Sequence, residues 1–354
     1  MTKTTNGIKE IHFPAFKNGF LANSKIIEKF FRLYITDSPD NIFMLNHSPC
    51  EDLLKAIKNA FPLSKVFFTI HDLGWTSSLS GDFDKLKQII SKETSKRIKA
   101  QYQSVIDYFH EEQRMYDIAD KVICLSNDTY QFLQEVYLLD KSKILLITNG
   151  LTDTHIPLSQ AKKQRLKIKM GIPPDEKILL VVGRTTPVKG VYSLLNAFTN
   201  VVKRYTNCRL VIAGRISDPD SILKLSKQVA TKVSYTGLLN KKDLTRWYQI
   251  ADIGLIPSLS EQCSYAGIEM MMHGLPVVAS NGFGVRNMFR EGVNAKIAET
   301  GNRKKKAFEN NLTTAILELL SSDTLYQQLS SGSRQTYESY YTSGKMKEGY
   351  KKLS

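Results

Sequence analysis

The sequence predicts an α/β protein with two doubly wound domains that face a central cleft. Its 354 residues are more than one hydrophobic core usually organises. Apolar runs alternate with stretches of helical spacing in both halves of the chain. The apolar runs are continuous, which is typical of parallel strands covered on both faces. We therefore expect two parallel sheets, each with helices on both sides.

Residues 1–155 are expected to form the N-terminal domain. The predicted strands are 9–13, 42–45, 65–70, 121–125 and 143–147. Helical spacing covers 21–34, 51–60, 127–136 and a long stretch from about 85 to 118. The polar stretch 76–81, directly after Trp75, predicts a mobile loop.

Residues 156–335 are expected to form the C-terminal domain. The predicted strands are 178–182, 209–213, 233–235, 253–256 and 276–279. The predicted helices are 191–204, 221–231, 242–251, 264–273 and 308–320. We expect residues 336–354 to form a C-terminal helix that packs back on the first domain.

Composition indicates a globular cytoplasmic protein. Hydrophobic residues make up 42% of the chain, and no apolar run approaches the ~20 residues of a membrane span. The polar start, Met1–Gly7, does not resemble a signal peptide. The four cysteines lack metal-ligand spacing, so we expect reduced thiols and no zinc site.

The net charge of +15 lies entirely in the second half, because residues 1–153 hold 19 Lys and Arg against 19 Asp and Glu. Such asymmetry predicts an acidic partner. Basic clusters at 162–165, 303–306 and 345–352 suit contact with an anionic membrane surface, at the inner face, although a solvated basic face is the commoner explanation. No nucleic-acid recognition motif is present, so a nucleic-acid partner is not expected.

The stretch Glu261–Glu269 lies between two predicted strands and contains a helix start near Ser264. Free backbone N–H groups and the helix dipole favour an anion there. Two carboxylates beside an anion site suit a ligand that joins a phosphate to hydroxyl groups, as a nucleotide-sugar does. The alternative interpretation is a capped helix with one glutamate that faces solvent.

Other candidate residues follow predicted strands, where ligands of doubly wound sheets bind. Arg184 and Lys189 flank a strand-to-helix turn and suit a diphosphate. The next two strands end in Gly214-Arg215 and Gly237-Leu238. These residues are expected either to border a nucleobase or to be ordinary turn residues. His71 follows a strand of the first half and is either catalytic or structural. No P-loop or dinucleotide-binding signature is present.

Together, the motifs resemble the retaining glycosyltransferases of family 4, glycosyl transferases group 1, which have the GT-B fold of two Rossmann-like domains. The resemblance rests on short motifs found in family order between about residues 40 and 340. They are Asn149-Gly150, Val182-Gly-Arg184, Lys189-Gly190, Thr236-Gly237, Glu261 with Glu269, and Gly274–Val278.

The resemblance implies transfer of a hexose or N-acetylhexosamine from a nucleoside-diphosphate sugar, with uridine as the expected base, to an unidentified acceptor. The nucleotide-sugar is then a co-substrate, and neither a cofactor nor a metal is expected. Arg184 and Lys189 would hold the diphosphate and Glu269 the ribose. Glu261 and His71 would lie at the donor sugar as the catalytic pair. The backbone N–H groups at the helix start would also bind the diphosphate; they belong to Ser264, Tyr265 and Ala266.

The chain departs from the family at its N-terminus. Family members usually begin with a strand and a Gly-rich loop, whereas Gly7 and Gly19 do not form such a loop. Either this unit lies upstream of the given start, or a partner chain supplies it, or the protein does without it. The alternative function is therefore a non-catalytic nucleotide-sugar-binding subunit that needs a partner for activity.

Overall fold

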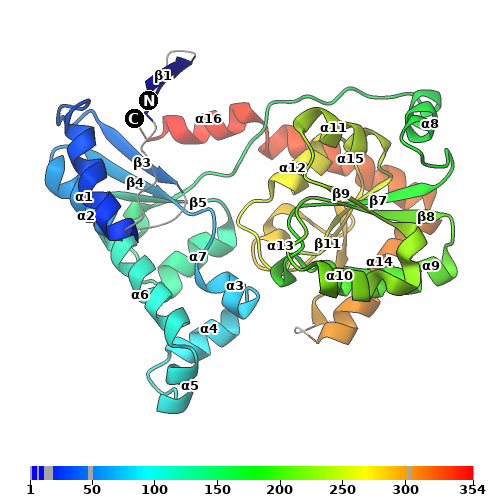
Figure 1. Cartoon of the computed structure of the whole chain (residues 1–354), viewed down its shortest axis with the longest axis horizontal. Coiled ribbons are helices and arrows are strands. Elements are labelled where there is room, and N and C mark those ends of the chain that lie inside the picture. The colour runs from blue at the N-terminus through cyan, green and yellow to red at the C-terminus, as the bar shows by residue number, and fades with distance from the viewer. Residues whose placement is uncertain (1, 6–7, 12–18, 47–50, 302–303, 354) are drawn as a thin grey trace.

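The computed structural model describes residues 2–353 except 6–7, 12–18, 47–50 and 302–303. It has two α/β domains, each built on a parallel sheet with helices on both sides (Figure 1). The predicted fold class is confirmed.

The N-terminal sheet has the order β3-β4-β5-β6, and every neighbouring pair is parallel. Its strands are β3 (Ile42–Asn46), β4 (Lys65–Thr69), β5 (Lys121–Cys124) and β6 (Ile144–Leu146). Its helices are α1 (Gly19–Arg32), α2 (Glu51–Ala60), α3 (Trp75–Leu79), α4 (Phe83–Ile90), α5 (Lys96–Gln101), α6 (Gln103–Ile118) and α7 (Asn127–Glu135), with a 3₁₀ turn at η1 (Lys141–Lys143). The central strands β4 and β5 are almost wholly buried, as their continuous apolar runs predict.

Most of the stretch predicted to be a mobile loop is the helix α3. Trp75 begins this helix and is fully buried. Its indole lies edge-on to the rings of Phe132 and Phe283, with centroids 5.5 and 6.3 Å away. The prediction is wrong because contacts with residues distant in the sequence outweigh the polar character of the segment.

The first predicted strand does not join the parallel sheet. It forms β2 (Ile8–Ile11), which pairs antiparallel with β1 (Thr2–Thr5) in a separate two-stranded sheet. Gly7 lies outside the described residues, and Gly19 begins α1.

The C-terminal sheet has the order β12-β11-β10-β7-β8-β9 and is parallel throughout. Its strands are β7 (Lys177–Val182), β8 (Cys208–Ala213), β9 (Val233–Gly237), β10 (Ile253–Ile256), β11 (Val277–Ser280) and β12 (Ala295–Ala298). Its helices are α8 (Gln160–Lys169), α9 (Val191–Arg204), α10 (Pro219–Ser226), α11 (Lys241–Ile250), α12 (Tyr265–Met272), α13 (Val285–Met288), α14 (Lys305–Ser321) and α15 (Asp323–Tyr340), with 3₁₀ turns η2 (Pro187–Lys189) and η3 (Lys227–Lys232). The strand order reverses between β7 and β10, so the carboxyl ends of these two strands flank the crevice where such sheets bind ligands.

The chain crosses between the domains twice, and the two crossings lie side by side. The first follows β6, and the second joins α15 to α16 (Ser343–Lys351). Leu151 N–H donates to Tyr341 O (2.9 Å), and Ser343 N–H donates to Leu151 O (2.8 Å). Helix α16 lies beside the N-terminal domain, and a Cβ on Gly349 would stand 2.7 Å from Ile147 (Figure 1). The boundary predicted at residue 336 falls inside α15.

A second set of contacts joins the domains at the start of α7. The Asp128 carboxylate accepts hydrogen bonds from Gly284 N–H (2.7 Å) and Arg286 Nε (2.8 Å) of the C-terminal domain. The Asn287 side chain accepts from Asp128 N–H (2.9 Å). The first turns of α7 and α13 are therefore fixed to each other.

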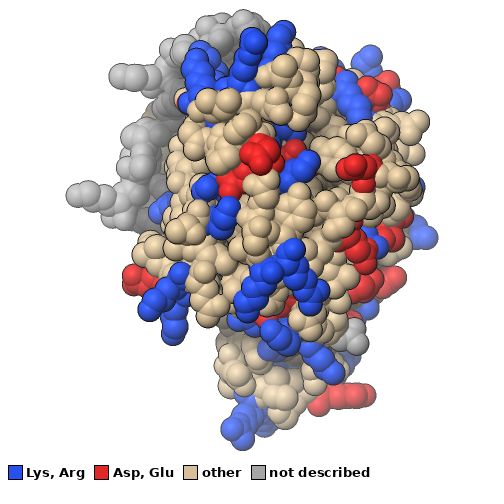
Figure 2. Space-filling view, turned by 90° about the vertical axis from the view of Figure 1, so that its right-hand side faces the viewer, with Lys and Arg blue, Asp and Glu red and all other residues tan. Residues whose placement is uncertain are grey.

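None of the described helices is long and apolar enough to cross a membrane. Figure 2 shows the C-terminal domain from the right-hand side of Figure 1, with Lys and Arg side chains over several parts of this face and acidic side chains between them. On this face the positive charge is thus spread out and mixed with acidic groups.

Candidate active site

A cavity of about 390 Å³ lies at the crevice between β7 and β10. The C-terminal domain supplies most of its lining, and the N-terminal domain adds His71, Leu125 and Asn149. Seven of the residues singled out from the sequence line it together: His71, Arg184, Lys189, Glu261, Ser264, Tyr265 and Ala266. The structure thus gathers side chains that lie up to 195 positions apart (from 71 to 266) at one strand edge.

An ion pair lies in the wall of this cavity. Lys189 Nζ lies 2.6 Å from Glu261 Oε1, which also accepts a hydrogen bond from Ser258 Oγ at 2.8 Å. Both charged side chains are partly buried, with 26% and 13% of their surface exposed. The cation therefore reaches across the crevice from the β7 side to the loop after β10.

Gly190 is required for this geometry. Its φ is +69°, in the left-handed region, and an added Cβ would lie 1.9 Å from Pro257 O. The turn that carries Lys189 can approach the end of β10 this closely only without a side chain at the next position.

The start of α12 forms another wall of the cavity. Ser264 is the N-cap, and its Oγ accepts from Gly267 N–H (3.2 Å). The Ser264 N–H donates to Met288 Sδ (3.2 Å). The N–H groups of Tyr265 and Ala266 belong to the first turn and have no carbonyl partner within the helix. They and the helix dipole favour an anion at this point.

Two N-terminal residues meet this wall from across the cleft. His71 follows β4, and its Nε2 lies 3.1 Å from Asn46 Oδ1. Asn149, which the sequence offered only as part of the Asn149-Gly150 motif, donates to Cys263 O (2.9 Å) and accepts from Tyr265 Oη (3.2 Å). Its local signal was the Asn-Gly pair, which does not reveal a contact with a loop more than a hundred residues away.

Cys263 also lines the cavity, but it is unsuited to be a nucleophile. Burial raises the pKa of its thiol to about 12. The thiolate, which is the nucleophilic form, is therefore scarce at neutral pH.

Glu269 lies outside this cavity, in a second one of about 290 Å³ between α11, α12 and α16. Its Oε2 accepts a hydrogen bond from Tyr248 Oη at 2.6 Å. Burial raises the pKa of Glu269, and the Tyr248 hydrogen bond opposes this. Tyr248 is buried and stacks on His273, with centroids 5.3 Å apart.

A third cavity of about 200 Å³ shares lining residues with each of the other two. It shares Arg184 with the first cavity and Leu244 with that of Glu269. Gly214, Arg215 and Leu238 line it, and Leu238 is 80% exposed. Gly237 directly precedes Leu238 but is not among the lining residues. The predicted diphosphate, nucleobase and ribose residues therefore line three neighbouring cavities, apart from Gly237.

The described residues contain no group of three or more His, Cys, Asp or Glu side chains that could hold a metal ion. Metal independence remains a prediction.

Comparison with known proteins agrees with this geometry. Residues 162–336 match the family model of glycosyl transferases group 1. An uncharacterized glycosyltransferase of Methanocaldococcus jannaschii is 32% identical over 178 residues, which cover 49% of this chain and 45% of the relative. A D-inositol 3-phosphate glycosyltransferase of Mycobacterium marinum is 27% identical over 193 residues, or 52% of this chain and 40% of the relative. The matches thus span less than half the length of these relatives.

Solved structures resemble the whole chain. Sucrose-phosphate synthase of Thermosynechococcus elongatus superposes with a TM-score of 0.76 over 99% of this chain and 84% of that one, at 18% identity. Anabaena HepE, in a complex with UDP-glucose, gives 0.69 over 96% and 85%, at 15% identity. At these identities, the likeness shows the fold. Residues 162–336, just under half of the chain, thus match the glycosyl transferases group 1 family, and the two domains have the GT-B fold.

Proposed function

We propose that this protein is a retaining glycosyltransferase that takes a hexose or N-acetylhexosamine from a UDP-sugar without a metal ion. The observation that carries the proposal is the Lys189–Glu261 pair, which lines the same cavity between the two domains as the N-terminus of α12. The family match and the presence of UDP-glucose in the complex of Anabaena HepE support it.

The leaving nucleoside diphosphate is stabilised by positive groups in this proposal. Arg184 and Lys189 line the cavity beside the start of α12. Charge develops on the diphosphate oxygens as the glycosidic bond breaks, and preorganised cations and N–H groups stabilise it most in a water-poor site. This arrangement performs the task for which other enzymes use a metal ion.

Glu261 and Glu269 have separate tasks. Glu261, in the first cavity, accepts hydrogen bonds from the sugar hydroxyls, whereas Glu269, in the second, accepts them from the ribose. The exposed Leu238 packs on the base. His71 lies on the opposite domain and contacts the reacting face of the sugar. The acceptor attacks on this face, which is also the face that the leaving group departs from.

The test is release of UDP from UDP-glucose, UDP-galactose and UDP-N-acetylglucosamine, with water as the acceptor. Lys189→Ala should lower the rate about 10²- to 10³-fold, as loss of one transition-state contact does in other enzymes. Glu269→Ala should mainly weaken UDP binding. Lys224→Ala, on the exposed side of α10, is the matched control and should leave both unchanged.

Failure of the wild-type protein to bind any nucleotide-sugar would refute the proposal. Binding of a donor without UDP release would instead favour the binding-subunit alternative.

A further inference from the structure

Gln262 has a buried hydrogen-bond donor with no acceptor in the described part of the chain. The residue follows Glu261, lines the first cavity and is only 4% exposed. Its amide nitrogen is buried and unpartnered among the described residues. Buried donors in native proteins nearly always have partners, so an unpaired donor beside a cavity indicates that a ligand supplies the acceptor.

The other domain fixes the orientation of this amide. Ser126 is the N-cap of α7, and its Oγ accepts from Thr129 N–H (3.2 Å). The Thr129 hydroxyl donates to Gln262 Oε1 (2.5 Å), so its oxygen is left to accept from the Ser126 hydroxyl 2.9 Å away. The amide oxygen is thereby occupied, and the nitrogen is the polar atom of this side chain that has no partner among the described residues.

The loop after β10 therefore presents two complementary groups side by side. Glu261 offers a carboxylate, which accepts hydrogen bonds, and Gln262 offers an amide N–H, which donates one. A sugar hydroxyl both donates and accepts, so a pair of ring hydroxyls can satisfy both groups. Free phosphate oxygens only accept, and the neighbouring carboxylate disfavours them.

We propose that Gln262 is a donor-sugar specificity residue whose amide N–H binds a sugar oxygen, and that Ser126 and Thr129 position it across the domain interface. This inference rests on the proposed function. Sugar recognition at this loop consequently depends on the N-terminal domain, although the loop belongs to the C-terminal one.

The experiment compares UDP with the UDP-sugar that the wild-type protein binds most tightly among UDP-glucose, UDP-galactose and UDP-N-acetylglucosamine. Gln262→Met keeps the length of the side chain and removes its polar atoms. Isothermal titration should show about 3- to 10-fold weaker binding of the UDP-sugar, as expected for one lost hydrogen bond, and UDP binding within about twofold of wild type.

The matched control is Gln134→Met on α7. Its amide nitrogen is also buried without a partner among the described residues, but it does not line the cavity. We expect it to leave both affinities unchanged. Thr129→Val removes the hydroxyl that orients Gln262. It should weaken binding of the UDP-sugar by about 2- to 5-fold and leave the affinity for UDP unchanged.

Equal weakening of UDP and UDP-sugar by Gln262→Met would place the amide at the diphosphate and overturn the inference, as would no change in either. If Gln262→Met does not fold, Thr129→Val decides, and an unchanged UDP-sugar affinity then counts against it. Absence of nucleotide binding by the wild type would instead overturn the proposed function.

Discussion

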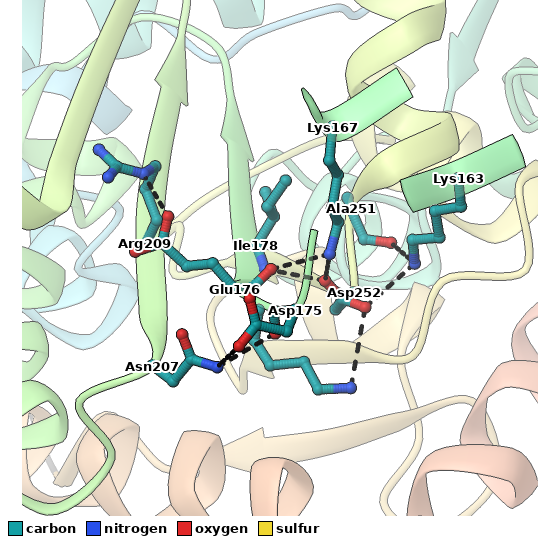
Figure 3. A network of polar contacts seen from close by, with 10 residues as sticks. Lys163, Lys167, Asp175, Glu176, Ile178, Asn207, Arg209, Ala251 and Asp252 are labelled. Carbon is teal, nitrogen blue, oxygen red and sulfur yellow. Dashed lines mark hydrogen bonds and ion pairs between the residues drawn. The ribbon is translucent and has the colours of Figure 1, made fainter. Parts of the chain in front are cut away.

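Replacement of Asp252 by Ala should destabilise the C-terminal domain strongly. Asp252 is 6% exposed and follows α11 at the amino ends of β7 and β10. Its carboxylate accepts from Lys163 Nζ (3.0 Å), Lys167 Nζ (2.9 Å) and Ile178 N–H (2.9 Å), as Figure 3 shows. It therefore ties α8 to the sheet.

The magnitude follows from what the substitution leaves behind. The side chains of Lys163 and Lys167 are only 15% and 4% exposed, and both would lose their counter-ion. Removal of one partner from a buried ion pair typically costs about 3 to 5 kcal/mol. For a domain of this size, that corresponds to a fall in Tm of roughly 6 to 20 °C. Asp252→Asn keeps an acceptor for Ile178 N–H and should cost less.

The effect should also depend on pH. Burial alone would raise the pKa of Asp252, but Lys163, Lys167 and the Ile178 N–H outweigh it, so the pKa lies below its ordinary value. An unfolded aspartate titrates near pH ~3.9. The ion pairs therefore stabilise the fold fully above that pH and are lost as the pH falls through the lower folded pKa.

Thermal unfolding followed by circular dichroism at pH 7 and at pH 3 measures this effect. Asp175→Ala is the control, since Asp175 is exposed and accepts only from Asn207 in this network (Figure 3). It should cost less than about 0.5 kcal/mol. The reasoning would be refuted if Asp252→Ala lowered the free energy of unfolding by less than about 1 kcal/mol at pH 7. It would also be refuted if the difference in stability between variant and wild type were not smaller at pH 3 than at pH 7.

Two further predictions concern buried carboxyl groups. Burial raises the pKa of Glu112 to about 7. Between pH 8 and pH 5 the folded protein therefore takes up a proton that the unfolded chain does not. The free energy of unfolding of the wild type should rise by up to about 3 kcal/mol as the pH falls over this range. Glu112→Gln should flatten that slope in urea unfolding, and a retained slope would exclude Glu112 as its source. Tyr248→Phe removes the hydrogen bond to Glu269 and should weaken UDP binding about 3- to 10-fold. The preference of this variant for UDP over 2′-deoxyuridine diphosphate should be smaller than that of the wild type. An unchanged preference would show that Glu269 does not bind the ribose.

Local patterns in the sequence predicted the C-terminal sheet closely. Strand β10 has the predicted bounds, and so does helix α9. Long apolar runs and clear helical spacing identify such elements without knowledge of their neighbours. Because ligand groups of doubly wound sheets follow strand ends, the same patterns placed Arg184, Lys189 and Glu261 in one cavity.

Features that depend on distant residues were not predictable. The short strand β12 carries Lys296 in its middle and was missed. The pairing of Thr129 with Gln262 joins residues 133 positions apart and leaves no periodic trace in the sequence. The separation of Glu269 from Glu261 into different cavities follows from the direction of α12, which spacing alone does not give.

The two neighbouring chain crossings at Leu151 and Thr342 restrict how the domains can move. Two backbone segments that are hydrogen-bonded to each other allow fewer relative rotations of the domains than a single linker would. A rotation that separates the domains at α7 would break the contacts of Asp128 with Gly284 and of Thr129 with Gln262 together. Under the proposed function, opening of the cleft would then also remove the residue that orients Gln262 toward the sugar.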